Sequence, residues 1–282
     1  MRPHFEATVA IDWSGAKGRR HKGIAIAEAR GSNPPRLVNP GHVWSRCEVL
    51  DWLLERAARE PTLFGFDFSF APPFVERGSY LPGETVPVEA KPFWAYVDRV
   101  SDDEDLGAAS FLEQRHRDHF YFGKADGTKS DYMHFREVER RFNAGGGGKA
   151  ATVFDAIGAA QVAKASFAGM RLLHRLDGKV PVWPFDPSPG DGSAVVEIYG
   201  RLYIRHAGLR GLKLRDRKSL NEALVALGSA PWTQRAALTD HASDALVTAA
   251  GMRRMLDHPA AFAPPGLTPE IARTEGWTFG VV

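Results

Sequence analysis

Four short apolar segments of this 282-residue chain each carry a carboxylate: residues 9–12, 64–67, 195–198 and 240–246. An unpaired carboxylate in an apolar environment costs several kcal/mol or is forced into its neutral form. Acids that are brought together in such an environment therefore need a compensating cation. The pattern predicts a folded core in which strands and one helix deliver acids to a divalent metal ion.

Two of the acids close predicted strands. Residues 7–11 and 63–66 are short runs of β-favouring residues bounded by polar or turn residues, and Asp12 and Asp67 follow them directly. If these strands are parallel neighbours, their carboxyl ends lie about 5 Å apart, within reach of one ion or a pair of ions. Glu197 belongs to a third such run, residues 193–199.

The last two acids belong to a predicted helix that runs to about Met255. Thr239 is a suitable N-cap for it, and Asp240 and Asp244 are four residues apart, so they share one face of the helix. His241, between them, is expected to point elsewhere.

This order of strand, strand, strand and final helix, each supplying an acid, resembles the RNase H-like superfamily of RNase H, Holliday-junction resolvases and integrases. Four motifs more closely resemble an uncharacterised bacterial family of predicted RNase H-like nucleases: Val-Ala-Ile-Asp-Trp-Ser-Gly (9–15), Gly-Phe-Asp-Phe-Ser-Phe (65–70), Val-Val-Glu-Ile-Tyr (195–199) and Asp-His-Ala-Ser-Asp-Ala-Leu (240–246). The chain departs from many relatives at Gly200, where they have Pro. The resemblance implies an α/β fold, an RNase H-like mixed sheet flanked by helices, and nuclease activity.

The expected chemistry is metal-assisted hydrolysis of phosphodiester bonds in a nucleic acid. Asp12, Asp67, Glu197 and Asp244 are the predicted catalytic acids and would hold two Mg²⁺ or Mn²⁺ ions, bridged by Asp12. Asp240 is expected as a fifth ligand or as a partner of a ligand. Carboxylate oxygens without cysteine favour Mg²⁺ or Mn²⁺ over Zn²⁺.

Three of the acids also have a purely structural interpretation. Asp12 could cap a turn, Asp240 could stabilise a helix N-terminus, and Glu197 could pair with a nearby arginine such as Arg201. These explanations leave Asp67 and Asp244 without a role, which favours shared metal binding.

The composition, 44% hydrophobic and 25% charged, is that of a globular protein. A single cysteine, Cys47, excludes an internal disulfide and a cysteine-based zinc site, which suits a reducing compartment. The N-terminus lacks an apolar signal core, and no segment approaches the roughly 20 apolar residues of a membrane span. A cytoplasmic protein without membrane association is expected.

The pattern along the chain predicts an RNase H-like core from residues 1–70 and 193–282, with a mainly helical insertion, 71–192, between the fourth and fifth strands. The expected core elements before the insertion are strands 7–12, 24–29, 36–44 and 63–67 and a helix over 47–59. The expected helices of the insertion are 92–100, 106–120, 132–142 and 152–176.

A net charge of +2 is too small to indicate a nucleic-acid partner by itself, but residues 201–218 contain seven Lys or Arg against one acid. From this run, Arg210, Lys213 and Arg215 are predicted to contact substrate phosphates. The alternative is a solvated loop and helix face.

Gly145–Gly148 precede Lys149 and a predicted helix, but Asn143 and Ala150 break the P-loop pattern. A weaker possibility is anion binding at that helix N-terminus, with Lys149 as a further substrate contact. Arg136 and Arg140 lie on one face of the predicted 132–142 helix, as a substrate clamp or, by preference, as surface ion pairs.

Two other functions stay open. An actin-like or sugar-kinase-like ATPase shares the half-fold and an Asp-x-x-Ser-Gly hairpin, although Asp67 is not followed by the second glycine-containing phosphate turn that such proteins use. A non-catalytic binding module could have kept the acids for stability. DNA or RNA as the nucleic acid, and a homodimer such as resolvases form, also stay open.

Overall fold

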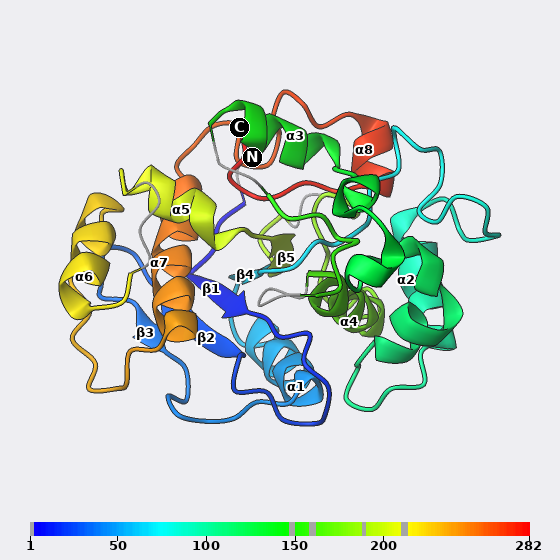
Figure 1. Cartoon of the computed structure of the whole chain (residues 1–282). Coiled ribbons are helices and arrows are strands. Elements are labelled where there is room, and N and C mark those ends of the chain that lie inside the picture. The colour runs from blue at the N-terminus through cyan, green and yellow to red at the C-terminus, as the bar shows by residue number, and fades with distance from the viewer. Residues whose placement is uncertain (1–2, 147–149, 158–161, 188–189, 210–213) are drawn as a thin grey trace.

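The computed structural model describes residues 3–146, 150–157, 162–187, 190–209 and 214–282. Its centre is a five-stranded mixed sheet with the order β3-β2-β1-β4-β5 (Figure 1). The strands are β1 (Ala7–Asp12), β2 (Ala25–Ala29), β3 (Arg36–Leu37), β4 (Thr62–Phe66) and β5 (Ala194–Glu197). β1, β4 and β5 run parallel, whereas β1 pairs antiparallel with β2 and β2 with β3. The carboxyl ends of three neighbouring strands therefore meet at one edge of the sheet.

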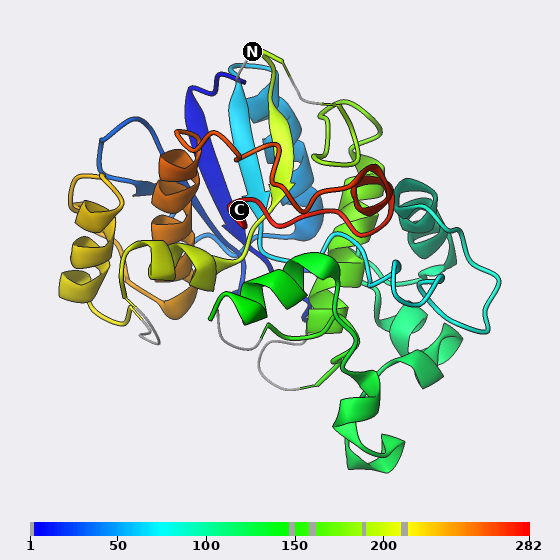
Figure 2. The same ribbon diagram turned by 90° about the horizontal axis from the view of Figure 1, so that it is seen from above.

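Helices cover both faces of this sheet (Figure 2). The α-helices are α1 (Arg46–Ala57), α2 (Ala90–Val100), α3 (Glu137–Ala144), α4 (Val162–Arg175), α5 (Gly200–His206), α6 (Arg217–Ala226), α7 (Asp240–Met255) and α8 (Pro269–Thr274). Four short 3₁₀ or π segments accompany them: Phe111–Arg115, Arg117–His119, Lys124–Asp126 and Lys129–Tyr132. α7 packs on β1, β2 and β3, whereas α1 packs on β4 and on α4.

Each strand divides its side chains between two cores, as the alternation of a β-strand requires. Val9 and Ile11 belong to the core on the α1 and α4 face, whereas Ala10 belongs to the core that contains α7. α7 approaches closely because Gly65 has no side chain, since a Cβ there would lie 2.7 Å from Met252 Sδ. The closeness of α7 to β1 is what lets acids from the two elements meet.

The predicted strand and helix order of the first 70 residues is confirmed, with one strand shorter than expected. β3 ends at Leu37 rather than continuing to residue 44. Asn39 has φ 44° and Gly41 has φ 86°, and such left-handed residues do not continue a strand.

Three predicted helices between β4 and β5 are also shorter. The predicted 132–142 helix begins only at Glu137, as α3. The predicted 106–120 helix is reduced to a π segment, Phe111–Arg115, and a 3₁₀ turn, because Asp105 and Leu106 have positive φ. The predicted 152–176 helix is described only from Val162, and residues 150–157 are not helical. The described residues after the glycine run, 150–157, therefore do not begin a helix. The anion site predicted at the start of such a helix has no support among the described residues.

The helical segment between β4 and β5 shares its core with the sheet. Phe93, Phe111 and Phe167 belong to the same hydrophobic cluster as Ile11 and Phe66. α2 and α4 therefore pack on the face of the sheet opposite α7, whereas Val138 and Phe142 of α3 belong to the core that contains α7.

In the described part of the chain, no helix combines the length and the apolar character that a membrane crossing requires.

Candidate functional site

Asp12 and Asp67 lie side by side on the α7 face of the sheet. The register pairs Ile11 with Phe66, so the next residue of each strand is an aspartate, and the Asp67 N–H donates to Ile11 O over 3.1 Å. Side chains of β1 alternate between the two faces of the sheet, so Asp12 lies on the same face as Thr8 and Ala10. This is the face of α7, because the hydroxyl of Thr8 donates to Ala249 O of α7 over 2.8 Å. The predicted convergence of these two acids is what the parallel register produces.

Asp67 is the centre of this acidic site. Burial raises its pKa well above the ordinary value, and the charges of Asp12, Asp244 and, least, Glu197 raise it further. The Gly200 N–H donates a hydrogen bond to Asp67, which lowers the pKa and opposes these effects. Asp244 reaches this place from α7, on the first turns after the Thr239 N-cap. Three carboxylates from β1, β4 and α7 thus act electrostatically on one another.

His241 completes the site, and the expectation that it points elsewhere is wrong. Its Nδ1 lies 2.6 Å from Asp12 Oδ2 and donates to that carboxylate. Burial raises the pKa of Asp12, and the hydrogen bond from His241 partly offsets this effect. The same hydrogen bond raises the pKa of His241, and the charges of Asp244 and Asp240 add to it. The imidazolium thus compensates part of the negative charge.

This pair predicts a titration that NMR can follow. In the wild-type protein the pKa of His241 should exceed its ordinary value of about 6.5, because the imidazolium donates to Asp12. Asp12→Asn should return the pKa toward that value, measured from the His241 Cε1–H shift against pH in chelator. The control is His4, which pairs with Glu6 at the surface. An unchanged His241 titration in Asp12→Asn would contradict the contact.

Asp240 occupies a different position from Asp244. It is exposed, at the first residue of α7, and its charge acts on His241. Among the residues that the structure describes, no group of three or more His, Cys, Asp or Glu side chains is arranged to hold a metal ion. A ligand role for any of these acids thus depends on side-chain movement.

Glu197 lies apart from the aspartates, on the other face of the sheet. Glu197 pairs with Phe66, whereas Asp67 is the next residue after Phe66, so the side chains of Glu197 and Asp67 belong to opposite faces of the sheet. In β5, Val196 rather than Glu197 faces the core that contains α7. Its carboxylate is bound by Arg136, whose guanidinium donates to Oε1 over 2.6 Å and to Oε2 over 2.7 Å. The structural interpretation of Glu197 as one half of an ion pair is therefore supported, but the partner is not Arg201.

The burial of Arg136 contradicts the expectation that Arg136 and Arg140 both lie on the surface of a helix. Arg136 is 1% exposed, whereas Arg140, one turn further, is half-buried and pairs with Glu76 and Glu137. Arg136 thus serves neither as an exposed substrate clamp nor as a surface ion pair.

The predicted phosphate contacts are mostly outside the described part of the chain. Lys149, Arg210 and Lys213 fall there, so their predicted roles stay predictions. Arg215 is exposed in the segment that leads to Asp216, the N-cap of α6. The phosphate contact of Arg215 also stays a prediction.

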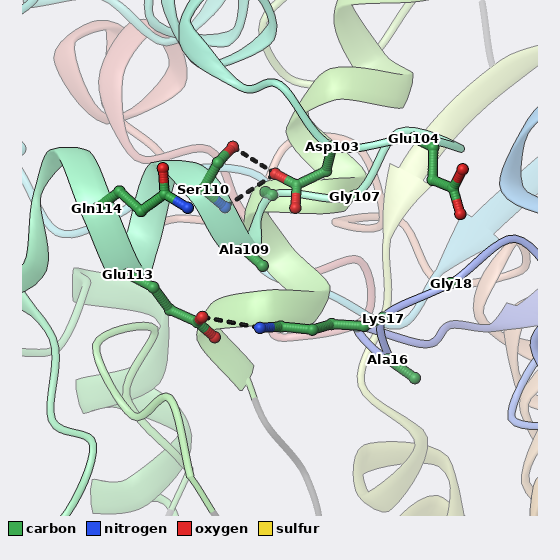
Figure 3. A pocket seen from close by; sticks show the side chains of 12 residues that line it. Ala16, Lys17, Gly18, Asp103, Glu104, Gly107, Ala109, Ser110, Glu113 and Gln114 are labelled. Atoms are coloured by element: carbon green, nitrogen blue, oxygen red, sulfur yellow. Dashed lines mark hydrogen bonds and ion pairs between the residues drawn. The ribbon is translucent and has the colours of Figure 1, made fainter.

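A pocket of about 150 Å³ lies beside the turn that follows β1 (Figure 3). Lys17 from this turn forms an ion pair of 2.8 Å with Glu113. Asp103 and Glu104 add two further acids, and Asp103 accepts hydrogen bonds from the N–H and hydroxyl of Ser110. Its lining therefore carries more negative than positive side chains, which disfavours a phosphate ligand.

The described chain is thus a mixed α/β protein with a five-stranded sheet, in which Asp12, Asp67 and Asp244 are half-buried near the carboxyl ends of β1 and β4. Comparison with protein-family models, with curated proteins and with solved structures found no match to this chain.

Proposed function

We propose that this protein is a metal-dependent nuclease that hydrolyses phosphodiester bonds with the carboxylates of Asp12, Asp67 and Asp244. The observation that carries the proposal is the placement of Asp67, whose pKa is raised by desolvation and by the charges of three other acids, Asp12, Asp244 and Glu197. A stability role alone would favour apolar or paired residues at this position, because clustered like charges are unfavourable. Perturbed acids of this kind are typical of functional sites.

The donor set suits a hard divalent cation. Asp12, Asp67 and Asp244 offer carboxylate oxygens, which Mg²⁺ and Mn²⁺ prefer, and a cation would relieve the mutual repulsion that raises the pKa of Asp67. Glu197 does not fit as a ligand, because Arg136 occupies both of its oxygens. The three aspartates would have to converge by side-chain rotation, since the described residues hold no ready-made ligand group.

The chain's own residues would orient this site. The Gly200 N–H donates to Asp67 and His241 Nδ1 donates to Oδ2 of Asp12, so each of these two carboxylates has one fixed contact and would be oriented for an ion by it. A bound Mg²⁺ or Mn²⁺ would lower the pKa of a water molecule and stabilise charge on the phosphate oxygens. His241 would carry a proton at Nδ1 near the reacting groups.

Two further features support nucleic acid as the substrate class. The order of three strands, a helix and a fourth strand is the order expected for an RNase H-like core. The basic run 201–218 begins directly after Gly200, the residue whose N–H donates to Asp67. The actin-like alternative is less favoured, because the turn after β1 borders a pocket with an acidic lining.

A ligand-dependent thermal melt combined with a hydrolysis assay separates the three functions. We expect Mg²⁺ and Mn²⁺ to stabilise the protein, by about 2.7 kcal/mol at 100 times the dissociation constant. We also expect oligonucleotide hydrolysis that chelator abolishes. Asp67→Asn is the matched control and should lose the metal response. Stabilisation only by ATP with metal would favour the kinase, and neither stabilisation nor hydrolysis would favour a binding module.

A further inference from the structure

Glu197 has no lone pair left for a metal ion. Oε1 accepts from Arg136 Nη2 and from the hydroxyl of Thr278, each over 2.6 Å. Oε2 accepts from Arg136 Nη1 and from the Phe70 N–H, each over 2.7 Å. An ionised carboxylate offers about four lone-pair positions, and all four are used. Glu197 is 3% exposed, so solvent does not compete for them.

The sheet register explains why Glu197 cannot simply turn toward the aspartates. Ile11, Phe66 and Glu197 form one row across β1, β4 and β5, on the face opposite α7. Asp12 and Asp67 are one residue further along their strands, so they belong to the other face. A rotation of the Glu197 side chain would leave it on the wrong side of the backbone.

Arg136 is fixed as firmly as Glu197. Its Nε and Nη2 donate to Glu139 Oε1 over 3.0 and 2.9 Å, and its Nη1 also donates to Glu275 O over 3.0 Å. Burial alone would lower the pKa of Arg136, but the charges of Glu197 and Glu139 raise it instead. The guanidinium is thus a permanent buried cation beside the glutamate that ends β5.

We propose that Arg136 neutralises Glu197 permanently, so that Glu197 takes no part in metal binding and the proposed site binds one divalent cation, through Asp12, Asp67 and Asp244. Glu197 is then a positioning residue. It fixes the end of β5 to Phe70, three residues after Asp67, and to Thr278. This inference rests on the proposed function and replaces the expectation of two ions bridged by Asp12.

The test counts the Mn²⁺ ions that the full chain binds. Electron paramagnetic resonance of free Mn²⁺ gives the bound number, without activity as the readout. The titration is repeated with DNA and RNA oligonucleotides whose phosphorothioate linkages resist hydrolysis, so that an ion that enters only with substrate is also counted. Asp67→Asn with the same oligonucleotide corrects for ions that the nucleic acid binds by itself.

We expect the wild-type protein to bind one ion more than Asp67→Asn, with and without oligonucleotide. Glu197→Gln, where it folds by circular dichroism, should bind as many ions as the wild type. A difference of two ions between wild type and Asp67→Asn would overturn the inference, while leaving the proposed nuclease in place. One ion without hydrolysis would overturn the proposed function and support the single site. The absence of bound Mn²⁺ would overturn both.

Discussion

Asp67→Asn should reduce nucleic-acid hydrolysis by two orders of magnitude or more, about 2.7 kcal/mol of lost transition-state stabilisation. The substitution keeps the shape of the side chain and an oxygen that can accept from the Gly200 N–H, but removes the charge at the centre of the three acids. Initial rates at saturating Mg²⁺ and Mn²⁺ measure the effect. Asp118→Asn, an exposed acid of the helical segment, is the matched control and should retain the wild-type rate.

The same variant should fold at least as stably as the wild type in chelator. The pKa of Asp67 is raised on folding, so its contribution to stability is present below the unfolded value of about 3.9 and is lost as the pH rises through the folded value. Above the folded value the ionised group destabilises the fold, and asparagine removes that cost. Wild-type hydrolysis by Asp67→Asn, or a lower melting temperature in chelator, would contradict the assignment.

Arg136→Met should destabilise the protein by about 3–5 kcal/mol, the largest stability effect that we expect from a single substitution. The change leaves the carboxylates of Glu139 and Glu197 buried without the guanidinium that now binds both. Burial already raises the pKa of Glu139, and Arg136 opposes that rise. Urea unfolding at pH 7 measures the difference.

The matched control is Arg140→Met, one helical turn away. Arg140 is 37% exposed and pairs with Glu76 over 2.5 Å at the surface, so its loss should cost at most about 1 kcal/mol. A triple variant, Arg136→Met with Glu139→Gln and Glu197→Gln, should recover part of the stability, because it removes the buried charges together. Equal effects of Arg136→Met and Arg140→Met would show that the buried cluster does not stabilise the fold.

The local sequence was sufficient for the elements that carry the aspartates. β-favouring runs bounded by polar residues predict β1 and β4, and Thr239 before a helical pattern predicts the start of α7. The side-chain hydroxyl of Thr239 indeed accepts from the Ala242 N–H over 3.1 Å. Once β1 and β4 are parallel neighbours with Ile11 opposite Phe66, Asp12 and Asp67 lie side by side, because each is the next residue of its chain segment.

The sequence could not place Glu197. In residues 194–198 both faces of the strand are apolar, so the pattern contains no polar alternation that would show which face Glu197 takes. The pairing of Phe66 with Glu197 decides this, and it depends on where β5 docks after the long helical segment. An acid at the end of a third strand is therefore not enough to predict a third ligand from the sheet.

The sequence by itself determined the strand and helix order, the cap of α7 and the place of an aspartate at the end of β1 and after β4, because these depend on neighbouring residues and on the period of a strand. Only the tertiary structure decided the partners of His241 and Arg136. The rotation of α7 about its axis sets whether His241 faces Asp12, and Arg136 reaches Glu197 across 61 residues of chain. Contacts between distant segments follow from how whole elements pack, which no local pattern encodes.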